Sequence, residues 1–196
     1  MRFGPQQTPP LEHQKTHVFL EGAFATEECA RLLAQAEAVP DETGQLIGGA
    51  AVREIRRCRV RWLPEDENFG WLYDRLIRLV AEANREHFNF DLWGMDERLQ
   101  LLEYGAGDLG FFDWHADRGR GGFAKVRKLS VSVQLSDPAD YRGGALELNP
   151  DGTPIEAPRS RGTATVFAAT VLHRVAPVTA GNRSALTAWF HGPHFR

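Results

Sequence analysis

KLSVSVQLSDPADYRGGALEL, residues 128–148, holds two β-like runs, KLSVSVQL and GALEL, joined by a segment rich in aspartate, proline and glycine. The same texture covers the chain from Leu99 onward. Further β-like runs are LQLLEY, GTATVFAA, VLHRVAPV and SALTAWF, separated by the turn-forming stretches GAGDLG, NPDG and TAGN. Many short strands with such turns predict a β-sandwich or barrel for this half of the chain.

The half of the chain before Leu99 has a different pattern. Residues 1–15 are expected to form a loose, proline-rich arm, and HVFLEGAF predicts a short strand. Thr26 is predicted as the N-cap of a helix over EECARLLAQAEAV. IRRCRVRWL alternates arginines with Cys58, Val60 and Trp62, which predicts a half-buried strand.

A second helix is predicted from Phe69 to about Phe88, because apolar side chains recur there at helical spacing. They are Leu72, Leu76, Leu79, Val80 and Ala83. Helices followed by short strands predict an α+β fold that is mainly β. The length of 196 residues suits a single domain, with helical support over 16–98 and the strands over 99–196.

The composition narrows the classes of function. A net charge of −3 and an isoelectric point near 6.2 give no electrostatic grip on nucleic acid or an anionic membrane. Two cysteines, Cys29 and Cys58, are too few for a disulfide framework or a cysteine zinc site. No apolar stretch approaches the roughly 20 residues that cross a bilayer, and the first residues lack the apolar core of a signal peptide. We therefore expect a cytoplasmic location.

FFDWHADRG, residues 111–119, places His115 and Asp117 one residue apart among aromatic side chains. On an extended segment such a pair projects to the same side, as a metal ion requires. A third ligand is expected from the β-like run that holds His173, although a core histidine satisfied by a backbone carbonyl is the alternative. Two histidines and one carboxylate match the facial triad of non-haem iron(II) enzymes. Zinc accepts the same ligands, so the triad alone leaves both metals open.

Arg183 favours iron. It follows His173 by ten residues, just beyond a TAG turn, and shares its parity with Ala185, Thr187 and Trp189, which suit an enclosed interior. An inward guanidinium needs an anion, and its planar fork matches a carboxylate; the alternative is a surface arginine at a strand start. A 2-oxoglutarate molecule meets both needs, since its keto-acid end chelates iron and its far carboxylate pairs with the arginine.

The chain from Leu99 to Phe195 resembles the iron(II)/2-oxoglutarate-dependent dioxygenases, in the prolyl 4-hydroxylase-like branch that includes the bacterial PKHD-type hydroxylases. The segments that carry the resemblance are EYGAG, WHAD, RKLSVSVQLSDPADYRGGALEL, GTATVF and HRVAPVTAGNRSALTAWFHGP. The resemblance implies a double-stranded β-helix, a jelly roll or cupin-like barrel supported by the N-terminal helices, with a site enclosed between two sheets.

The resemblance also implies the chemistry of the site. His115, Asp117 and His173 would be the catalytic iron ligands, Arg183 the 2-oxoglutarate anchor, and Tyr104 a side chain lining the same pocket. Iron(II), 2-oxoglutarate and dioxygen are the implied cofactors, with ascorbate as a further candidate. In the family, 2-oxoglutarate is converted to succinate and CO2 while an aliphatic C–H is hydroxylated. Related halogenases leave the carboxylate position for chloride, so hydroxylation is expected here.

One position departs from the prolyl hydroxylase pattern. Phe112 stands where these enzymes carry a tyrosine whose hydroxyl helps to hold the co-substrate. Tyr104, Ser132 and Thr187 are the candidates to replace that hydroxyl. Dry, unreactive walls are expected from the aromatic residues Phe111, Phe112, Trp114 and Trp189.

The substrate is less well defined. The resemblance favours an amino-acid-type substrate, free or within a peptide and proline-like residues included, while the oligomeric state stays open. Nucleic-acid demethylases are disfavoured because Trp189 stands where they carry a second arginine. A zinc-dependent isomerase or a sensor, without oxygenase activity, is the alternative from another class.

Basic side chains near the site leave further alternatives. The arginines before the barrel form either a solvated strand face or a contact with a substrate carboxylate; they are Arg53, Arg56, Arg57, Arg59 and Arg61. The loop DRGRGGFAKVRK, with Arg118, Arg120, Lys125 and Arg127, is either a mobile lid or an ordinary connection. His191 and His194 are expected to be bystanders.

Overall fold

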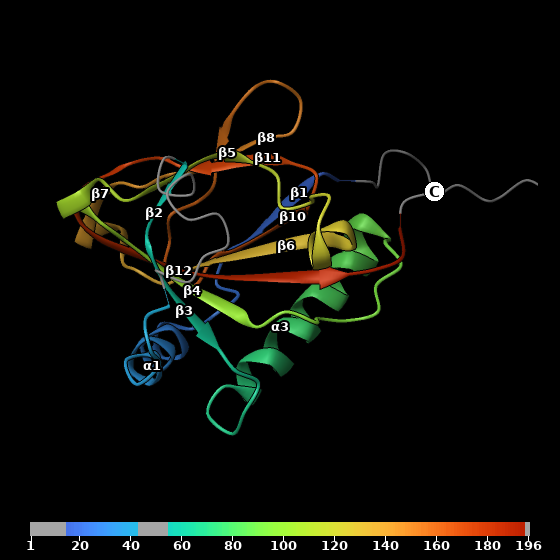
Figure 1. The fold of residues 1–196 in the computed structure, drawn as a ribbon, viewed down its shortest axis with the longest axis horizontal. Coiled ribbons are helices and arrows are strands. Elements are labelled where there is room, and N and C mark those ends of the chain that lie inside the picture. Colours follow the sequence, from blue (N-terminus) through green and yellow to red (C-terminus); the bar gives the residue numbers. More distant parts are fainter. Residues whose placement is uncertain (1–14, 43–54, 195–196) are drawn as a thin grey trace, which may run out of the picture.

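The computed structural model describes residues 15–42 and 55–194. They form two antiparallel sheets that face each other (Figure 1). The larger sheet contains, in spatial order, β1 (His17–Leu20), β10 (Ala164–Ala168), β6 (Arg127–Gln134), β12 (Val178–His191), β4 (Leu99–Gly105) and β3 (Arg59–Leu63), with β7 (Tyr141–Gly143) paired to β12. The smaller sheet contains β2 (Arg56–Arg57), β5 (Phe111–His115), β11 (Leu172–Val175), β8 (Leu146–Asn149) and β9 (Ile155–Glu156). Every β-like run predicted from the sequence contributes to one of these strands.

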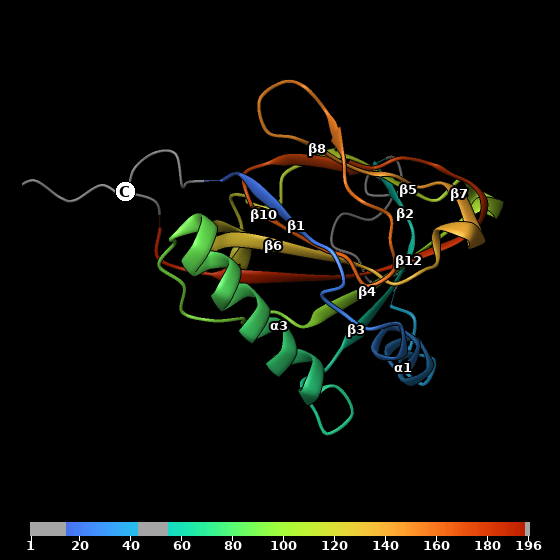
Figure 2. The same cartoon turned by 180° about the vertical axis from the view of Figure 1, so that it is seen from behind.

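Two helices cover the outer face of the larger sheet, as Figure 2 shows from behind. They are α1 (Thr26–Ala36) and α3 (Gly70–Ala83), which continues as a π-helical turn over Asn84–Phe88. The apolar face predicted for the second helix is confirmed, because all five of its named side chains are buried. Short 3-10 segments occur at Ala106–Asp108, Gly122–Lys125 and Pro138–Asp140. Among the described residues, no helix combines the length and apolar character needed to cross a membrane.

The start of α1 differs from the prediction by one residue. Ala25, not Thr26, is the extended N-cap, and its backbone N–H donates to the Glu28 carboxylate at 2.8 Å. The capping interaction therefore comes from an acidic side chain in the first turn, so the hydroxyl of Thr26 is not needed as a cap. The predicted arm over residues 1–15 lies outside the described residues, apart from Lys15.

The two-residue repeat of the central strands sorts side chains onto opposite faces of the larger sheet. Side chains on the outer face of β4, β6 and β12 pack against the helices; they are Leu99, Leu101, Leu129, Val131, Val133, Leu186, Ala188 and Phe190. Their neighbours in sequence face the smaller sheet and line a cavity; they are Gln100, Leu102, Tyr104, Ser132, Arg183, Ala185, Thr187 and Trp189. The hydrophobic core thus lies on the helix side, and the polar positions are directed between the sheets.

Gly181 lies inside β12, opposite Tyr141 of β7. Its φ is +68°, a left-handed conformation that glycine adopts without strain. A Cβ at this position would lie 2.0 Å from the backbone oxygen of Asp140. The chain just before β7 therefore approaches β12 so closely that glycine is required at this position, two residues before Arg183.

Candidate functional site

The cavity between the sheets has a volume of about 230 Å³. His115, Asp117 and His173 lie together in its wall. His115 ends β5 and stands directly opposite His173 on the antiparallel neighbour β11, while Asp117 follows two residues later. This register brings residues 58 positions apart in sequence into contact.

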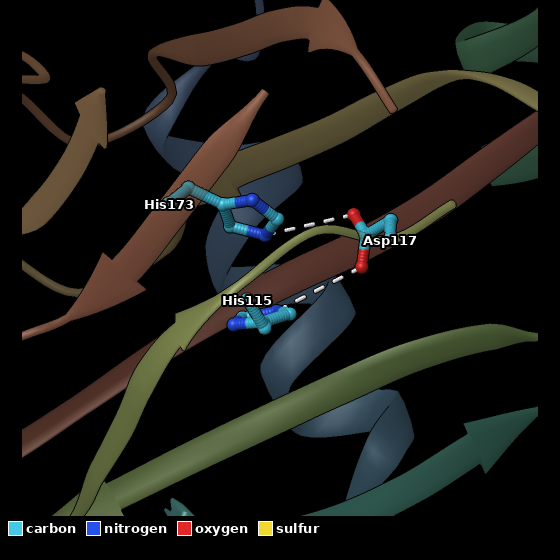
Figure 3. Close-up of side chains that lie close together, drawn as sticks. All are labelled: His115, Asp117 and His173. Atoms are coloured by element: carbon cyan, nitrogen blue, oxygen red, sulfur yellow. Dashed lines mark ion pairs between the residues drawn. The ribbon is translucent and has the colours of Figure 1, made fainter. Parts of the chain in front are cut away.

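Three potential ligand atoms converge in this cluster (Figure 3). Asp117 Oδ1 lies 3.8 Å from His115 Nε2, and Asp117 Oδ2 lies 3.6 Å from His173 Nε2. One ligand atom from each residue lies within 4.8 Å of the others, a spacing that one metal ion can bridge. In the part of the chain that the structure describes, no other group of histidine, cysteine and carboxylate side chains converges in this way.

Both imidazoles are oriented by backbone carbonyls. His115 Nδ1 lies 2.8 Å from the carbonyl oxygen of Asp113, and His173 Nδ1 lies 3.0 Å from that of Val171. A carbonyl only accepts, so Nδ1 carries the proton in each ring and the Nε2 lone pair is free to face Asp117. His173 thus has the carbonyl partner that the core-histidine alternative requires, but this hydrogen bond uses Nδ1 and leaves Nε2 available as a ligand atom.

Electrostatics favour the ligand forms of the cluster. Burial, and then the proximity of His173, lower the pKa of His115 to about 4, so this imidazole is neutral at neutral pH. Burial alone would raise the pKa of Asp117, but His173, His115 and a hydrogen bond from Ser130 keep it below its usual value. Ser130 Oγ donates to Asp117 Oδ2 at 2.6 Å. An ionised carboxylate beside a neutral imidazole is what a divalent cation requires.

A bulge in β5 decides which aromatic residues reach the cavity. His115 pairs with His173 but Phe112 pairs with Val175, so the register shifts between them. Phe112 and His115 consequently point to the same side although they are three positions apart, and their rings stack with centroids 3.5 Å apart. Phe112 and Trp189 line the cavity as predicted.

The prediction that Phe111 and Trp114 wall the site is wrong. Neither lines the cavity: Arg57 lies over the Phe111 ring at 5.4 Å, and Arg174 lies over the Trp114 ring at 4.8 Å. The bulge explains why Phe112 and not Phe111 shares the face of His115, and Trp114 points to the opposite face because it is the neighbour of His115 in the strand.

Arg183 lies deep in the cavity and is only 2% exposed. Its Nε donates to Gln134 Oε1 at 3.1 Å, and its guanidinium carbon lies 5.6 Å from the centroid of the Tyr104 ring. Its Nη1 is buried and has no hydrogen-bond partner among the described residues. A buried cation with a spare donor is a site for an anion. The surface-arginine alternative is therefore wrong.

Gln134 was not recognised from the sequence. It accepts from Arg183, and its Nε2 donates both to the Tyr141 hydroxyl and to the carbonyl oxygen of Ser136, each at 3.1 Å. This network fixes the amide so that its oxygen faces the guanidinium. The signal available in the sequence was parity, since Gln134 follows Ser130 and Ser132 at two-residue spacing on β6.

The three hydroxyls proposed in place of a tyrosine at Phe112 all line the cavity. Tyr104 is opposite Arg183 in the pairing of β4 with β12, and Ser132 is opposite Thr187 in the pairing of β6 with β12. Burial raises the pKa of Tyr104 well above its usual value, so its hydroxyl stays protonated and can donate. All three stand on the same sheet as the guanidinium.

Arg127 supports the cluster from the end of the glycine-rich loop. Its Nη1 donates to the backbone carbonyl of Asp117 at 3.1 Å, and its guanidinium lies 3.8 Å from the centroid of the Trp189 ring. Glu97 forms an ion pair with Arg127, in which Nε and Oε1 are 2.7 Å apart. His191 contacts the same carboxylate through Nε2 at 2.9 Å. His191 is fully buried but does not line the cavity, whereas His194 is exposed and outside it.

The arginines that precede the barrel separate into different environments. Arg56 lines the cavity, while Arg57 and Arg59 are exposed and Arg61 is paired with Glu103. Arg53 lies outside the described residues. The loop after Asp117 forms the 3-10 segment Gly122–Lys125, and its role as a lid stays a prediction.

Comparison with known proteins agrees with this geometry. The family model of the 2OG-Fe(II) oxygenase superfamily matches residues 99–191. A PKHD-type hydroxylase of Delftia acidovorans is 30% identical over 171 residues, which cover 84% of this chain and 72% of that protein. One from Psychrobacter is 39% identical over 123 residues, 60% of this chain and 48% of that protein. A Maricaulis maris relative is 45% identical over 62 residues, 31% of this chain. The chain thus spans less than half the length of several curated relatives that it matches.

Solved structures show the same fold. A prolyl hydroxylase of Trichoplax adhaerens, in complex with a hypoxia inducible factor oxygen degradation domain peptide, superposes with a TM-score of 0.74 at 20% identity, covering 90% of this chain and 83% of that chain. A prolyl-4-hydroxylase of Pseudomonas putida superposes with a TM-score of 0.67 at 21% identity, covering 91% and 93%. These neighbours confirm the double-stranded β-helix predicted for the strands. From its sequence relatives and its fold, the chain belongs to the 2OG-Fe(II) oxygenase superfamily, in the PKHD-type hydroxylase branch.

Proposed function

We propose that this chain is an iron(II)- and 2-oxoglutarate-dependent dioxygenase that hydroxylates an aliphatic C–H bond of an amino-acid-type substrate, with release of succinate and CO2. The observation that carries the proposal is the presence of two unlike anchors in one cavity. One is the cluster of His115, Asp117 and His173, and the other is the buried guanidinium of Arg183 with its spare donor. A dicarboxylic keto acid that chelates a metal at one end fits both anchors.

The donor set of the cluster suits iron(II). Two imidazole nitrogens and one carboxylate are the ligands of the facial triad, which leaves adjacent positions for co-substrate and dioxygen. We assign His115, Asp117 and His173 as the ligands. When bound, the iron and 2-oxoglutarate supply the oxidising chemistry. The protein holds Nε2 of each ring within 3.8 Å of an Asp117 oxygen, and one ligand atom from each of the three residues lies within 4.8 Å of the others.

We assign the co-substrate carboxylate to Arg183, held in place by Gln134. Tyr104, Ser132 and Thr187 line the same cavity and supply hydroxyl donors in place of the one that Phe112 lacks. Donors fixed before the ligand arrives need no reorganisation when it binds, which raises affinity.

The remaining walls exclude water and offer few reactive groups. They are formed by Phe112, Leu102, Leu146, Phe167, Val175 and Trp189. A dry cavity strengthens the electrostatic contacts inside it and suppresses side reactions of an oxidising site. This setting supports hydroxylation of an aliphatic carbon held against the cluster.

Further parts of the proposal depend on supporting observations. An amino-acid-type substrate, free or peptidyl and proline-like residues included, is supported by the prolyl hydroxylases among the structural neighbours. Ascorbate is proposed as an auxiliary reductant. A cytoplasmic location is supported by Cys29 and Cys58, both free thiols. We treat residues 99–196 as the catalytic barrel and 16–98 as its support within one domain, with no nucleic-acid or membrane partner.

The test is metal analysis combined with 2-oxoglutarate turnover. Protein loaded with iron(II) and 2-oxoglutarate without oxygen, then exposed to oxygen with a panel of amino acids and peptides, should form succinate and add one oxygen atom to one of them. His115→Ala should abolish succinate formation, whereas His194→Ala, an exposed histidine outside the cavity, should not. Stoichiometric zinc without succinate would instead favour the zinc-dependent isomerase or sensor.

A further inference from the structure

Arg56 is a second cavity arginine without a charged partner among the described residues. Its Nε donates to Cys58 Sγ at 3.0 Å, and its Nη2 lies 3.5 Å from Gln100 Oε1. Its guanidinium carbon lies 4.9 Å from the centroid of the Phe112 ring. All three partners are neutral, so the charge of Arg56 is not compensated by the part of the chain that the structure describes.

The position of Arg56 differs from that of Arg183. Arg56 stacks on Phe112, which in turn stacks on His115 at 3.5 Å, so its guanidinium lies on the side of the metal-binding cluster. Arg56 is partly exposed, whereas Arg183 is only 2% exposed. Arg183 also borders the inner recess formed with Gln134, and Arg56 does not. The two arginines therefore mark the solvent side and the deep side of the cavity.

When the charges of the cavity wall are paired with one another and with the expected cofactors, one cation remains that can contact the substrate. The charged wall residues among those described are three arginines and one carboxylate, Asp117. Arg127 is neutralised by Glu97 outside the wall. A divalent metal with Asp117 and a 2-oxoglutarate dianion with Arg183 together carry no net charge, so the positive charge of Arg56 is the one left in the wall. A carboxylate group of the substrate beside Arg56 would compensate this charge locally.

Two further polar side chains line the same cavity, and Gln100 is the one beside Arg56. Gln100 is opposite Thr187 on β12, and Trp189 is two residues further along on the same face. The Nε1 of Trp189 is buried and has no hydrogen-bond partner among the described residues. A buried donor of this kind is costly unless a ligand or water accepts from it. This orphan donor is independent of the charge argument and also points to a polar ligand group.

We propose that Arg56, assisted by Gln100, binds the carboxylate of the substrate, so that the substrate is a small aliphatic amino acid with a free α-carboxylate rather than an internal residue of a peptide. A guanidinium fork matches a carboxylate better than it matches a neutral peptide carbonyl. The volume of about 230 Å³ lies below the usual range for ligand pockets, which favours a small substrate. This inference rests on the proposed function, since it names the substrate class of the same site.

The experiment compares matched acid and amide probes. Binding of L-valine, L-leucine, L-isoleucine, L-proline and L-lysine, and of the carboxamide of each, is measured by calorimetry on protein loaded with iron(II) and 2-oxoglutarate without oxygen. We expect at least one acid to bind roughly tenfold to a hundredfold more tightly than its amide, the effect of one or more charge-assisted hydrogen bonds. Arg56→Gln should remove that preference, and Arg56→Lys should restore part of it.

Arg57→Gln is the matched control, because Arg57 is the adjacent, exposed residue of β2 and contacts Phe111 outside the cavity. It should keep the full preference. Equal binding of acid and amide in every pair, including binding of neither, overturns the proposal. So does an acid preference that survives Arg56→Gln, or a loss of 2-oxoglutarate binding in that variant as large as the loss of amino-acid binding. Absence of succinate formation by the wild-type protein would be a different outcome, because it would contradict the proposed function itself.

Discussion

Replacing Arg183 by methionine is expected to weaken 2-oxoglutarate binding without lowering the stability of the ligand-free protein. The side chain is 2% exposed, its Nη1 is unpaired among the described residues, and its Nε donates to a neutral amide. A buried charge without a counter-charge costs several kcal/mol of desolvation. The ligand-free fold therefore contains a local cost that a bound carboxylate removes.

Two opposing changes set the stability of the ligand-free variant. Removal of the buried charge stabilises by about 1–4 kcal/mol in comparable replacements by apolar residues. Loss of the 3.1 Å hydrogen bond leaves Gln134 Oε1 unpaired, which costs about 1–3 kcal/mol for a buried acceptor. These ranges overlap, so the free energy of unfolding should stay within about 1 kcal/mol of wild type. In the complex, each lost charge-assisted hydrogen bond is worth about 1.5–3 kcal/mol, so the Kd for 2-oxoglutarate should rise roughly tenfold to a hundredfold.

Calorimetric titration of 2-oxoglutarate into oxygen-free, iron(II)-loaded protein measures the Kd, and urea unfolding without ligand measures the stability. Arg174→Met is the control, because Arg174 is an arginine of β11 outside the cavity that pairs with Glu147 at 2.8 Å. It should leave the Kd unchanged. An Arg183→Met protein that loses more than about 3 kcal/mol of unfolding free energy and keeps the wild-type Kd would refute the reasoning.

Three further predictions concern the surroundings of the site. Asp117→Ala should abolish iron(II) binding in equilibrium dialysis, while Asp113→Ala, an exposed carboxylate on the same segment whose backbone carbonyl is retained, should bind iron normally. Gln134→Leu should raise the Kd for 2-oxoglutarate several-fold, because the guanidinium of Arg183 loses the side chain that fixes its position. Gln134→Glu should restore neither the affinity nor the selectivity for 2-oxoglutarate, because its carboxylate would neutralise Arg183. Kd values equal to that of the wild type in both variants would contradict this. Arg127 and His191 outweigh burial and hold the pKa of Glu97 below its ordinary 4.5, so the stability from Glu97 is present above that pH and lost as pH falls through the lower folded value. Unfolding free energy should then fall less steeply below pH 4.5 in Glu97→Gln than in wild type.

The strands and the deep anchor were predictable because strand periodicity is fixed by backbone geometry. Once Arg183 is placed in the last strand, Ala185, Thr187 and Trp189 must share its face, and all of them line the cavity. The pairing of His115 with His173 could be predicted only from their shared ability to bind a metal, because the register between distant strands depends on the whole sheet.

The errors have equally specific causes. The expected walls included neighbouring residues of FFDWH, although neighbours in a strand point to opposite faces, and the bulge in β5, which no residue of this stretch indicates, decides that Phe112 and not Phe111 faces the cavity. The role of Arg127 depends on how the loop after Asp117 returns to β6, which sequence periodicity does not describe. Arg56 could not be separated from Arg57 because the two are adjacent and chemically identical, and only the pairing of β2 with β5 decides which one faces inward.

Because β4, β6 and β12 place alternate side chains on opposite faces of the sheet, the cavity can contain polar groups and accept substitutions. Stability comes from the outer face, where side chains such as Leu101, Val131 and Leu186 pack against the helices, each contributing on the order of 1.5–3 kcal/mol when fully buried. The inner face is therefore free to carry uncompensated cations and hydroxyls that a hydrophobic core would exclude. Phe112 can replace a tyrosine on this account, because the fold does not depend on that hydroxyl and Tyr104, opposite Arg183, lines the same cavity with another one. The same separation means that a substitution on the inner face should change which acids bind well before it changes whether the chain folds.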